Sequence, residues 1–224
     1  MRIAIYTLTR DRLEYTKQCF ETLKQKAGYD YDHYVIDNGS TDGTQEWLKE
    51  QELKKVIYNS SNVGISKASN QALDEIFKEE YDLIIKFDND CEVESDGILK
   101  TVSGIYESCG KFSPKYVLSP YVKGIANQPT RSHDTGLGLH TIGITAIVGG
   151  IFHIVPADVY RDYRFDEKLP LAKGQDDVFC KWVKDNGGVI GYIEELKVWH
   201  KDTTEGQCKK YPDYFTRKWN EEIT

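Results

Sequence analysis

The chain has no long apolar run and few of the features that mark secreted or zinc-binding domains. None of its 224 residues lies in an apolar segment long enough to cross a bilayer, and no signal-type stretch precedes the strand-like segment Ile3–Tyr6. The five cysteines are odd in number, scattered and without CxxC spacing, so the sequence predicts neither a disulfide framework nor a zinc site. We therefore expect a soluble, cytoplasmic protein.

An excess of basic residues is also missing. Lys and Arg number 29 against 36 Asp and Glu, and the resulting net charge of −7 argues against a protein that mainly wraps nucleic acid or coats acidic membranes. No linker rich in Pro, Gly and Ser divides the chain, and its length suffices for a domain with its own core. We expect a single domain over residues 1–224.

The first half alternates strand-like and helix-like segments. This rhythm predicts right-handed crossovers and a mainly parallel sheet covered on both faces, which is an α/β fold. Strands are expected at 3–8, 33–36, 56–58 and 83–87, and helices at 13–26, 44–52 and 67–78. Ligands of such folds bind beyond the carboxyl ends of the strands. Polar clusters follow the strands at just these ends: Thr9 to Arg12, Asp37 to Gly43, Asn62 to Ser66 and Asp88 to Asp90.

The last of these clusters places two carboxylates, Asp88 and Asp90, one residue apart after an apolar run. If strand geometry persists through Asn89, both acids project to the same side and Asn89 points away. Such a pair repels itself unless a cation or a hydrogen-bonding ligand lies between, which favours a divalent metal. A solvated Asp-Asn turn is the alternative.

The second half is less regular. Strands are expected at 116–121, 189–193 and 196–199, a further apolar run at 144–156, and helices at 95–106, 157–160, from about 175, and near 213–222. Gly149 and Gly150 interrupt the apolar run, which indicates a bulge or a close approach by another group such as a sugar. Residues 124–143 have little periodicity and predict a long loop, either an acceptor-facing flap or a mobile excursion.

Four motifs, taken together and in order, resemble the nucleotide-sugar half of family-two glycosyltransferases of the GT-A fold: Thr7–Arg12, Val35–Thr44, Asn62–Gly64 with Asn70, and Phe87–Asp90. The resemblance continues to about His200. It implies an α/β/α sandwich with a mainly parallel, mixed central sheet and a Rossmann-like nucleotide-binding half. It also implies that a sugar moves from a nucleoside diphosphate to an acceptor hydroxyl with inversion, assisted by Mn²⁺ or Mg²⁺.

The same resemblance divides the chain by role. Residues 1–94 would bind the nucleotide sugar, and residues 95–200 would bind the acceptor and hold the catalytic group. Residues 201–224 form a tail with several basic and aromatic residues. The tail either folds over the diphosphate as a lid or packs on the domain as an amphipathic helix.

The resemblance also implies a set of donor and metal contacts. The expected donor contacts are Thr9, Arg10, Asp37, Asn62, Gly64, Asp88 and Asn89. Asp90 and His200 would bind the metal, with Asp88 contacting the ribose or the metal through water, and imidazole beside carboxylate suits Mn²⁺ somewhat better than Mg²⁺. Some of these residues have an ordinary alternative. Asp37 could cap the helix near Thr44, although Asp42 could do so instead; Arg10, like Arg12, could meet phosphate or be a surface arginine; and His200 could be a satisfied polar group.

Gln175-Asp176 matches the family's Glu-Asp pair, whose Asp is the general base, although the chain departs from the family by having Gln at 175. An acid at a helix start is well placed to take a hydroxyl proton, and the neighbouring charge of Asp177 raises the proton affinity of the pair. The alternative is that both acids stabilise the helix N-terminus.

Two other functions are alternatives to sugar transfer. Sugar nucleotidyltransferases of related fold carry a Gly-rich phosphate loop after the first strand, whereas Thr9–Arg12 contains no glycine. A non-catalytic nucleotide- or glycan-binding module is the other alternative. The acceptor stays open between a saccharide, a lipid-linked glycan, a protein side chain and a modified nucleobase. The net charge argues against the nucleobase, and the basic residues of the tail argue for it.

Overall fold

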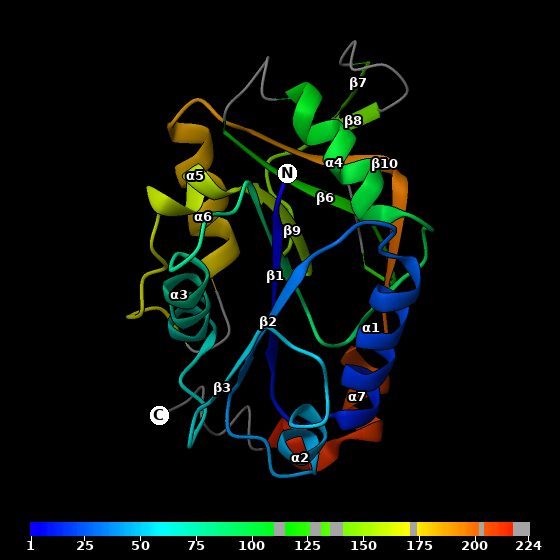
Figure 1. Cartoon of the computed structure of the whole chain (residues 1–224), viewed down its shortest axis with the longest axis vertical. Coiled ribbons are helices and arrows are strands. Elements are labelled where there is room, and N and C mark those ends of the chain that lie inside the picture. Colours follow the sequence, from blue (N-terminus) through cyan, green and yellow to red (C-terminus); the bar gives the residue numbers. More distant parts are fainter. Residues whose placement is uncertain (110–114, 126–130, 135–140, 171–173, 202–203, 217–224) are drawn as a thin grey trace.

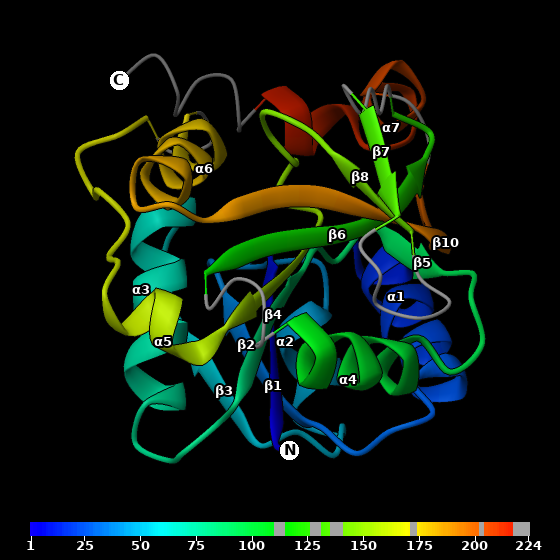
Figure 2. The same cartoon turned by 90° about the horizontal axis from the view of Figure 1, so that it is seen from above.

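The computed structural model describes residues 1–109, 115–125, 131–134, 141–170, 174–201 and 204–216. Within these residues a single mixed sheet separates two layers of helices (Figures 1 and 2). Figure 2 shows α3, α5 and α6 on one side of the sheet and α1 and α4 on the other. The strand order is β3-β2-β1-β4-β9-β6-β10-β8-β7, with β5 paired to β10.

The amino-terminal half is the parallel half. Strands β1, β2, β3 and β4 pair only in parallel with one another. The strands are β1 Ile3–Thr9, β2 Asp32–Asp37, β3 Lys55–Tyr58 and β4 Leu83–Phe87; the helices are α1 Leu13–Lys26, α2 Thr44–Leu48 and α3 Ile65–Ile76. The predicted alternation is confirmed element by element, and all of these carboxyl ends therefore lie at one edge of the sheet.

The second half adds mostly antiparallel pairs. β9 runs antiparallel to both β4 and β6, β6 and β10 are parallel, and β8 and β5 pair antiparallel with β10. The strands are β5 Cys91–Val93, β6 Tyr116–Lys123, β7 Arg131–Asp134, β8 Thr141–Ile144, β9 Phe152–Pro156 and β10 Val189–His200; the helices are α4 Ile98–Cys109, α5 Ala157–Arg161, α6 Gln175–Asp185 and α7 Thr204–Lys210. The predicted α/β fold is confirmed, with a sheet that is mixed beyond β4.

Two sequence predictions need correction here, and a third is tested only in part. Part of the expected loop 124–143 forms the hairpin of β7 and β8, and its residues 126–130 and 135–140 lie outside the described part. The two strands expected at 189–199 are one strand, β10, whose register with β6 shifts between Ile193 and Lys197. Of the helix expected near 213–222, residues 212–216 are helical and the remainder is not described.

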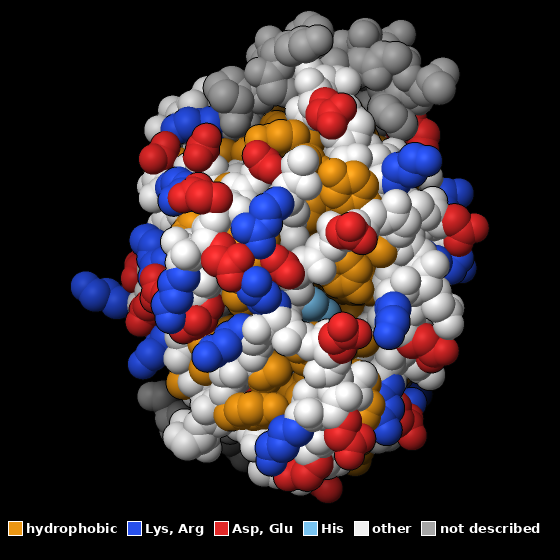
Figure 3. Space-filling view, viewed as in Figure 1, with side chains coloured by type: hydrophobic (Ala, Val, Ile, Leu, Met, Phe, Trp, Pro, Cys, Tyr) orange, Lys and Arg blue, Asp and Glu red, His pale blue; other side chains and the backbone are white. Residues whose placement is uncertain are grey.

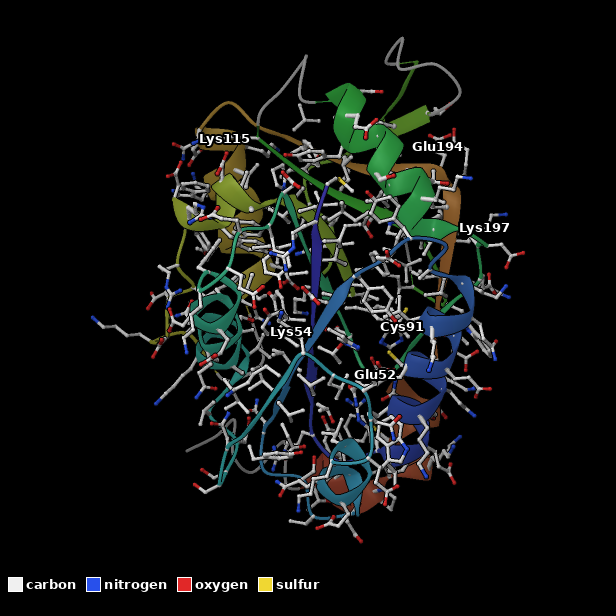
Figure 4. All side chains as sticks on the ribbon, in the orientation of Figure 1. Glu52, Lys54, Cys91, Lys115, Glu194 and Lys197 are labelled. Carbon is white, nitrogen blue, oxygen red and sulfur yellow. The ribbon has the colours of Figure 1, made fainter. Side chains whose placement is uncertain are left out.

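Alternation along the buried strands divides the core between the two faces of the sheet. In β4, Ile85 and Phe87 pack in the cluster with α1 and α4, whereas Ile84 packs in the cluster with α3 and α6. Figure 4 shows Cys91, at the start of β5, beside α1. The cysteines whose side chains are described, Cys19, Cys91, Cys180 and Cys208, are free thiols. None of the described helices is long and apolar enough to cross a membrane.

One buried histidine makes the stability of this core depend on pH. His33 in β2 is 7% exposed, its Nε2 lies 3.0 Å from the Thr7 hydroxyl, and its ring packs against Phe20 with centroids 4.5 Å apart. Burial lowers the pKa of His33 to about 3. The unfolded chain therefore binds the proton below about pH 6.5, whereas the folded chain does not.

We expect His33→Gln to flatten the pH dependence of stability. Between pH 6 and 4 the free energy of unfolding should fall about 1.4 kcal/mol less per pH unit in the variant than in the parent chain. Urea unfolding at several pH values measures this slope. Tyr31→Phe, which alters a ring 6.0 Å from His33 but removes no imidazole, is the control and should keep the parental slope. Equal slopes in His33→Gln and the parent would contradict the assignment.

Candidate functional site

The loop after β1 has an unusual backbone that directs Arg12 toward the end of β4. Asp11 and Arg12 adopt φ values of 50° and 60°, a left-handed conformation that non-glycine residues rarely take. Contacts with the loop after β2 hold it: the Ser40 hydroxyl accepts from the Asp11 N–H at 2.7 Å, and the Asp11 carboxylate accepts from the Thr41 N–H at 2.8 Å. Strained residues of this kind persist where the surroundings fix them, often at functional sites.

Arg12 forms a buried ion pair with Asp90. Its guanidinium donates to Asp90 Oδ2 at 2.7 Å, to Asn89 Oδ1 at 3.0 Å and to Gln207 Oε1 at 2.8 Å. The side chains of Arg12 and Asp90 are each 10% exposed. Burial alone would raise the pKa of Asp90, but the charges of Arg12 and His200 outweigh it and lower this pKa to about 2. Asp90 is therefore a carboxylate throughout the physiological range.

His200 and the tail complete this cluster. The antiparallel register of β10 with β5 pairs His200 with Cys91, and this brings His200 Nε2 to 3.6 Å from Asp90 Oδ2. Gln207 in α7 donates to the same carboxylate oxygen at 3.1 Å. The ring of Tyr214 lies under the Arg12 guanidinium, 4.6 Å from its centroid. Gln207 and Tyr214 of the tail thus pack against the groups at the end of β4, which is compatible with both alternatives given for residues 201–224.

The donor atoms present fit a divalent cation in part. Asp90 and His200 bring an oxygen and a nitrogen to one place, and Mg²⁺ or Mn²⁺ is often held by one or two protein groups together with substrate phosphates. Among the described residues, however, no three His, Cys, Asp or Glu side chains form a cluster that could hold a metal alone. Arg12 and Gln207 also occupy the carboxylate oxygen that faces His200, so an ion bound there must compete with them.

Asp88 belongs to a different ion pair, which corrects the expectation that the two acids face one spot. β4 ends at Phe87, so strand geometry does not persist through Asn89. Asp88 accepts from Lys86 Nζ at 2.6 Å, and its side chain remains 32% exposed. Asn89 does not point away from Asp90 as the strand geometry predicts: its amide oxygen accepts from the same Arg12 guanidinium at 3.0 Å, and its amide nitrogen donates to Thr16 in α1 at 2.9 Å.

Asp176 approaches this second pair from α6. It lies in the first turn of the helix, and its Oδ2 accepts from the Gly150 N–H at 2.9 Å. The carbonyl of Gly150 in turn accepts from Lys86 Nζ. The group that approaches Gly150 closely is thus the Asp176 carboxylate. The adjacent Asp177 is exposed, so the structure brings Asp176 rather than Asp177 to the site.

Asp37 organises a turn instead of presenting an open carboxylate. It is fully buried and accepts from the Ser40 N–H at 2.9 Å, the Ser40 hydroxyl at 2.5 Å and Gln45 Nε2 at 2.6 Å. The capping role that was its alternative belongs to Asp42, which accepts from the Thr44 N–H at 3.1 Å. These three bonds leave at most one acceptor position of the buried carboxylate for a nucleobase.

The remaining predicted donor residues lie at the carboxyl ends of β1 and β3. Thr9 is 1% exposed, and its carbonyl accepts from the Asn38 N–H at 2.8 Å. The Arg10 guanidinium lies 6.0 Å from the centroid of the Tyr214 ring. Asn62 accepts from the N–H of Gly64, the residue before α3, at 3.1 Å.

Sequence reasoning missed four participants: Lys86, Gly150 as a partner of Asp176, Gln207 and Tyr214. The sequence contains an indication of the role of Lys86, because a lysine within an otherwise apolar strand needs a buried partner. It contains no such indication for Gln207, since this residue is 195 residues away from its partner Arg12 in the chain.

We expect Arg12→Met to destabilise the fold by about 3–5 kcal/mol, because it leaves the buried Asp90 carboxylate without its main counter-charge. The double variant Arg12→Met/Asp90→Asn should recover most of that loss. Arg161→Met is the matched control: Arg161 pairs with Glu80 at 2.7 Å at the surface, and its loss should cost about 0–1 kcal/mol. Urea unfolding measures all of these variants, and a stable Arg12→Met with an unstable double variant would contradict the pairing.

Comparison with solved structures identifies this architecture. The fold matches S. aureus TarS 1-349 in complex with UDP-GlcNAc with a TM-score of 0.67 and 16% identity, over 91% of this chain and 59% of that one. It matches the mannosyltransferase PcManGT from Pyrobaculum calidifontis, in complex with GDP-Man and Mn²⁺, with a TM-score of 0.66 and 14% identity, over 92% and 58%. GalNAc-T7 with UDP, GalNAc and Mn²⁺ gives a TM-score of 0.71 and 14% identity, over 92% and 45%.

The chain thus spans between 45% and 59% of the length of these structures, and at these identities the likeness is one of fold. A sequence comparison with curated proteins gives no match. The model of the family described as glycosyl transferase family 2 matches residues 4–130, more than half of the chain. That span covers β1 to β4 with the polar loops after them, and so confirms the resemblance inferred from the motifs: the chain belongs to glycosyl transferase family 2 and has a GT-A fold.

Proposed function

We propose that this protein transfers a sugar from a nucleoside diphosphate sugar to an acceptor hydroxyl with inversion, using a divalent metal and Asp176 as general base. The observation that carries the proposal is that the loop after β4, the end of β10 and the start of α6 meet beyond the end of β4. Asp90 lies beside His200 at 3.6 Å, and Asp176 is held by the Gly150 N–H at 2.9 Å, next to the Lys86–Asp88 pair. The donor diphosphate would therefore bind near Asp90, and the acceptor hydroxyl near a different acid, Asp176.

On the donor side, Asp90 and His200 would hold Mn²⁺ or Mg²⁺ together with diphosphate oxygens, and Asp88 would contact the ribose or a metal-bound water. The metal when bound would act as a Lewis acid on the departing diphosphate. Support comes from the Asp90–His200 geometry and from the Mn²⁺ in the PcManGT and GalNAc-T7 structures. Asp37, Thr9, Arg10, Asn62, Gly64 and Asn89 line or support the loops around the proposed nucleotide site.

On the acceptor side, Asp176 would accept the hydroxyl proton. The residue is partly exposed, and among the described residues the Gly150 N–H donates to its Oδ2, so we propose that Oδ1 receives the incoming hydroxyl. We propose residues 95–200 as the acceptor half. On the face seen in Figure 3, acidic and basic side chains are intermingled. The net charge of −7 favours a saccharide acceptor over a polyanion.

A panel of nucleotide sugars and acceptors tests the reaction class. Release of nucleoside diphosphate with formation of a glycoside of inverted anomeric configuration is the expected result. Pyrophosphate release would indicate a nucleotidyltransferase, and binding without turnover across the panel a binding module. Turnover of a saccharide acceptor should change little when salt is raised, whereas transfer to a polyanion should fall steeply.

We expect Asp90→Ala or His200→Ala to weaken binding of Mn²⁺ and of UDP together, because both groups would contact the ion that joins the protein to the diphosphate. Calorimetry with and without chelator isolates the metal-dependent part of UDP binding. This difference matters because Asp90→Ala also leaves Arg12 free to attract the diphosphate directly. Asp177→Ala is the control and should bind like the parent. Full metal-dependent binding in Asp90→Ala would remove Asp90 from the metal site.

We expect Asp176→Asn to retain UDP binding and to reduce transfer about a hundredfold or more, since Asn keeps the size of the side chain but cannot take the proton. Asp177→Asn, one residue along the same helix, is the matched control and should lose much less. Initial rates at saturating donor and acceptor measure both. An inactive Asp177→Asn beside an active Asp176→Asn would move the base by one residue, and two active variants would rule out this mechanism.

A further inference from the structure

Lys86 is the one charged residue within β4, between Ile85 and Phe87. It is 4% exposed, and its side chain points to the face of the sheet that α3 and α6 cover. An unpaired ammonium in such a place is strongly unfavourable, so its contacts must compensate the lost hydration. The proposed function assigns it no role.

The contacts of Lys86 connect the donor side of the site to the base. Its Nζ donates to Asp88 Oδ1 at 2.6 Å and to the carbonyl of Gly150, and the N–H of the same glycine donates to Asp176 Oδ2 at 2.9 Å. Burial by itself lowers the pKa of Lys86, but Asp88 and Asp176 raise it above its ordinary value. Lys86 therefore stays an ammonium between two carboxylates.

The space around Gly150 shows how closely these groups converge. A Cβ placed on Gly150 would lie 2.5 Å from Asp176 Oδ1 and 2.9 Å from Lys86 Nζ. Both are the ends of flexible side chains, so a methyl group there would displace them without moving backbone. The neighbouring Gly149 has nothing within 4 Å of its Cβ position among the described residues.

The strands on either side keep Lys86 in place. In register with it lie Tyr6 of β1 and His153 of β9, both buried. His153 Nε2 lies 3.1 Å from the carbonyl of Val148, close to the glycine pair in the chain. The Lys86 stem is thus enclosed on both sides, and its ammonium has a defined position under Gly150.

We propose that Lys86 and Gly150 form a bracket that positions the Asp176 carboxylate for proton abstraction and separates its charge from that of Asp88. Lys86 fixes the carbonyl of Gly150, and the N–H of the same residue, which belongs to the preceding peptide unit, fixes the orientation of Asp176. The inference rests on the proposed role of Asp176 and adds two positioning residues, neither of which takes up the proton.

The kinetic test uses Gly150→Ala, with Gly149→Ala as the matched control, and Lys86→Met. Displacement of a catalytic group by about 1 Å can cost about a hundredfold in rate. Gly150→Ala and Lys86→Met should therefore lower kcat tenfold to a hundredfold while the KM for the donor sugar changes less than about threefold. Gly149→Ala and Lys181→Met, an exposed lysine of α6, should behave like the parent. A parental kcat in Gly150→Ala, or equal losses in both glycine variants, would overturn the proposal.

A second test does not depend on turnover and so separates this inference from the proposed function. Urea unfolding of Lys86→Met, Asp176→Asn and their double variant forms a cycle, and we expect the double variant to lose less stability than the two single losses added together. The same cycle with Asp177→Asn should be additive. Additivity in both cycles would overturn the bracket even if the parent transfers sugar. Coupling at Asp176 in a parent that transfers no sugar would leave the bracket standing and remove the enzymatic proposal. If Lys86→Met does not fold, Gly150→Ala replaces it in the cycle.

Discussion

The structure depends on pairing buried charges at the carboxyl end of β4. Asp90 is paired with Arg12 at 2.7 Å and Asp88 with Lys86 at 2.6 Å, so each acid beyond the strand has a cation supplied by the protein. Removing one member of such a pair leaves an uncompensated charge in a poorly hydrated place, which costs far more than the pair contributes. This constraint explains why a lysine occupies a buried strand and why the loop after β1 adopts a left-handed backbone.

The two ion pairs lie in different parts of the site. The Arg12–Asp90 pair lies with His200 and the tail, where a cation and a diphosphate would be received, and Gln207 donates to the same carboxylate oxygen. The Lys86–Asp88 pair lies against Gly150 and, through it, Asp176. Without Arg12 and Lys86, the carboxylates of Asp88, Asp90 and Asp176 would be three negative charges close together, with no cation of the protein to compensate them.

If a metal and a donor bind at Asp90 as proposed, Arg12 and Gln207 would have to release the carboxylate oxygen that they now share. The freed Arg12 guanidinium would then be available to the diphosphate, for which its planar fork is suited. Arg12 stacks on Tyr214 and donates a hydrogen bond to Gln207, so this exchange would also change the contacts of these two tail residues. The sheet beneath need not move, since β1, β4 and β10 are anchored by their neighbours.

How much of this could be predicted follows from what sequence patterns encode. Periodicity determined the alternation of strands and helices, including the bounds of α1, because it reports which face of each element is apolar. The order of the polar motifs at the strand ends predicted the family, and the resemblance to that family predicted Asp90, His200 and Asp176 as site residues.

Only the tertiary structure decided which charges pair. Asp88 and Asp90 separate because the strand ends at Phe87, and the partners of Asp90 come from positions 78 and 117 residues away in the chain. Lys86 meets Gly150 across 64 residues, through the antiparallel pairing of β4 with β9. Local periodicity says that a side chain is buried, but its partner depends on strand order and register, which long-range packing sets.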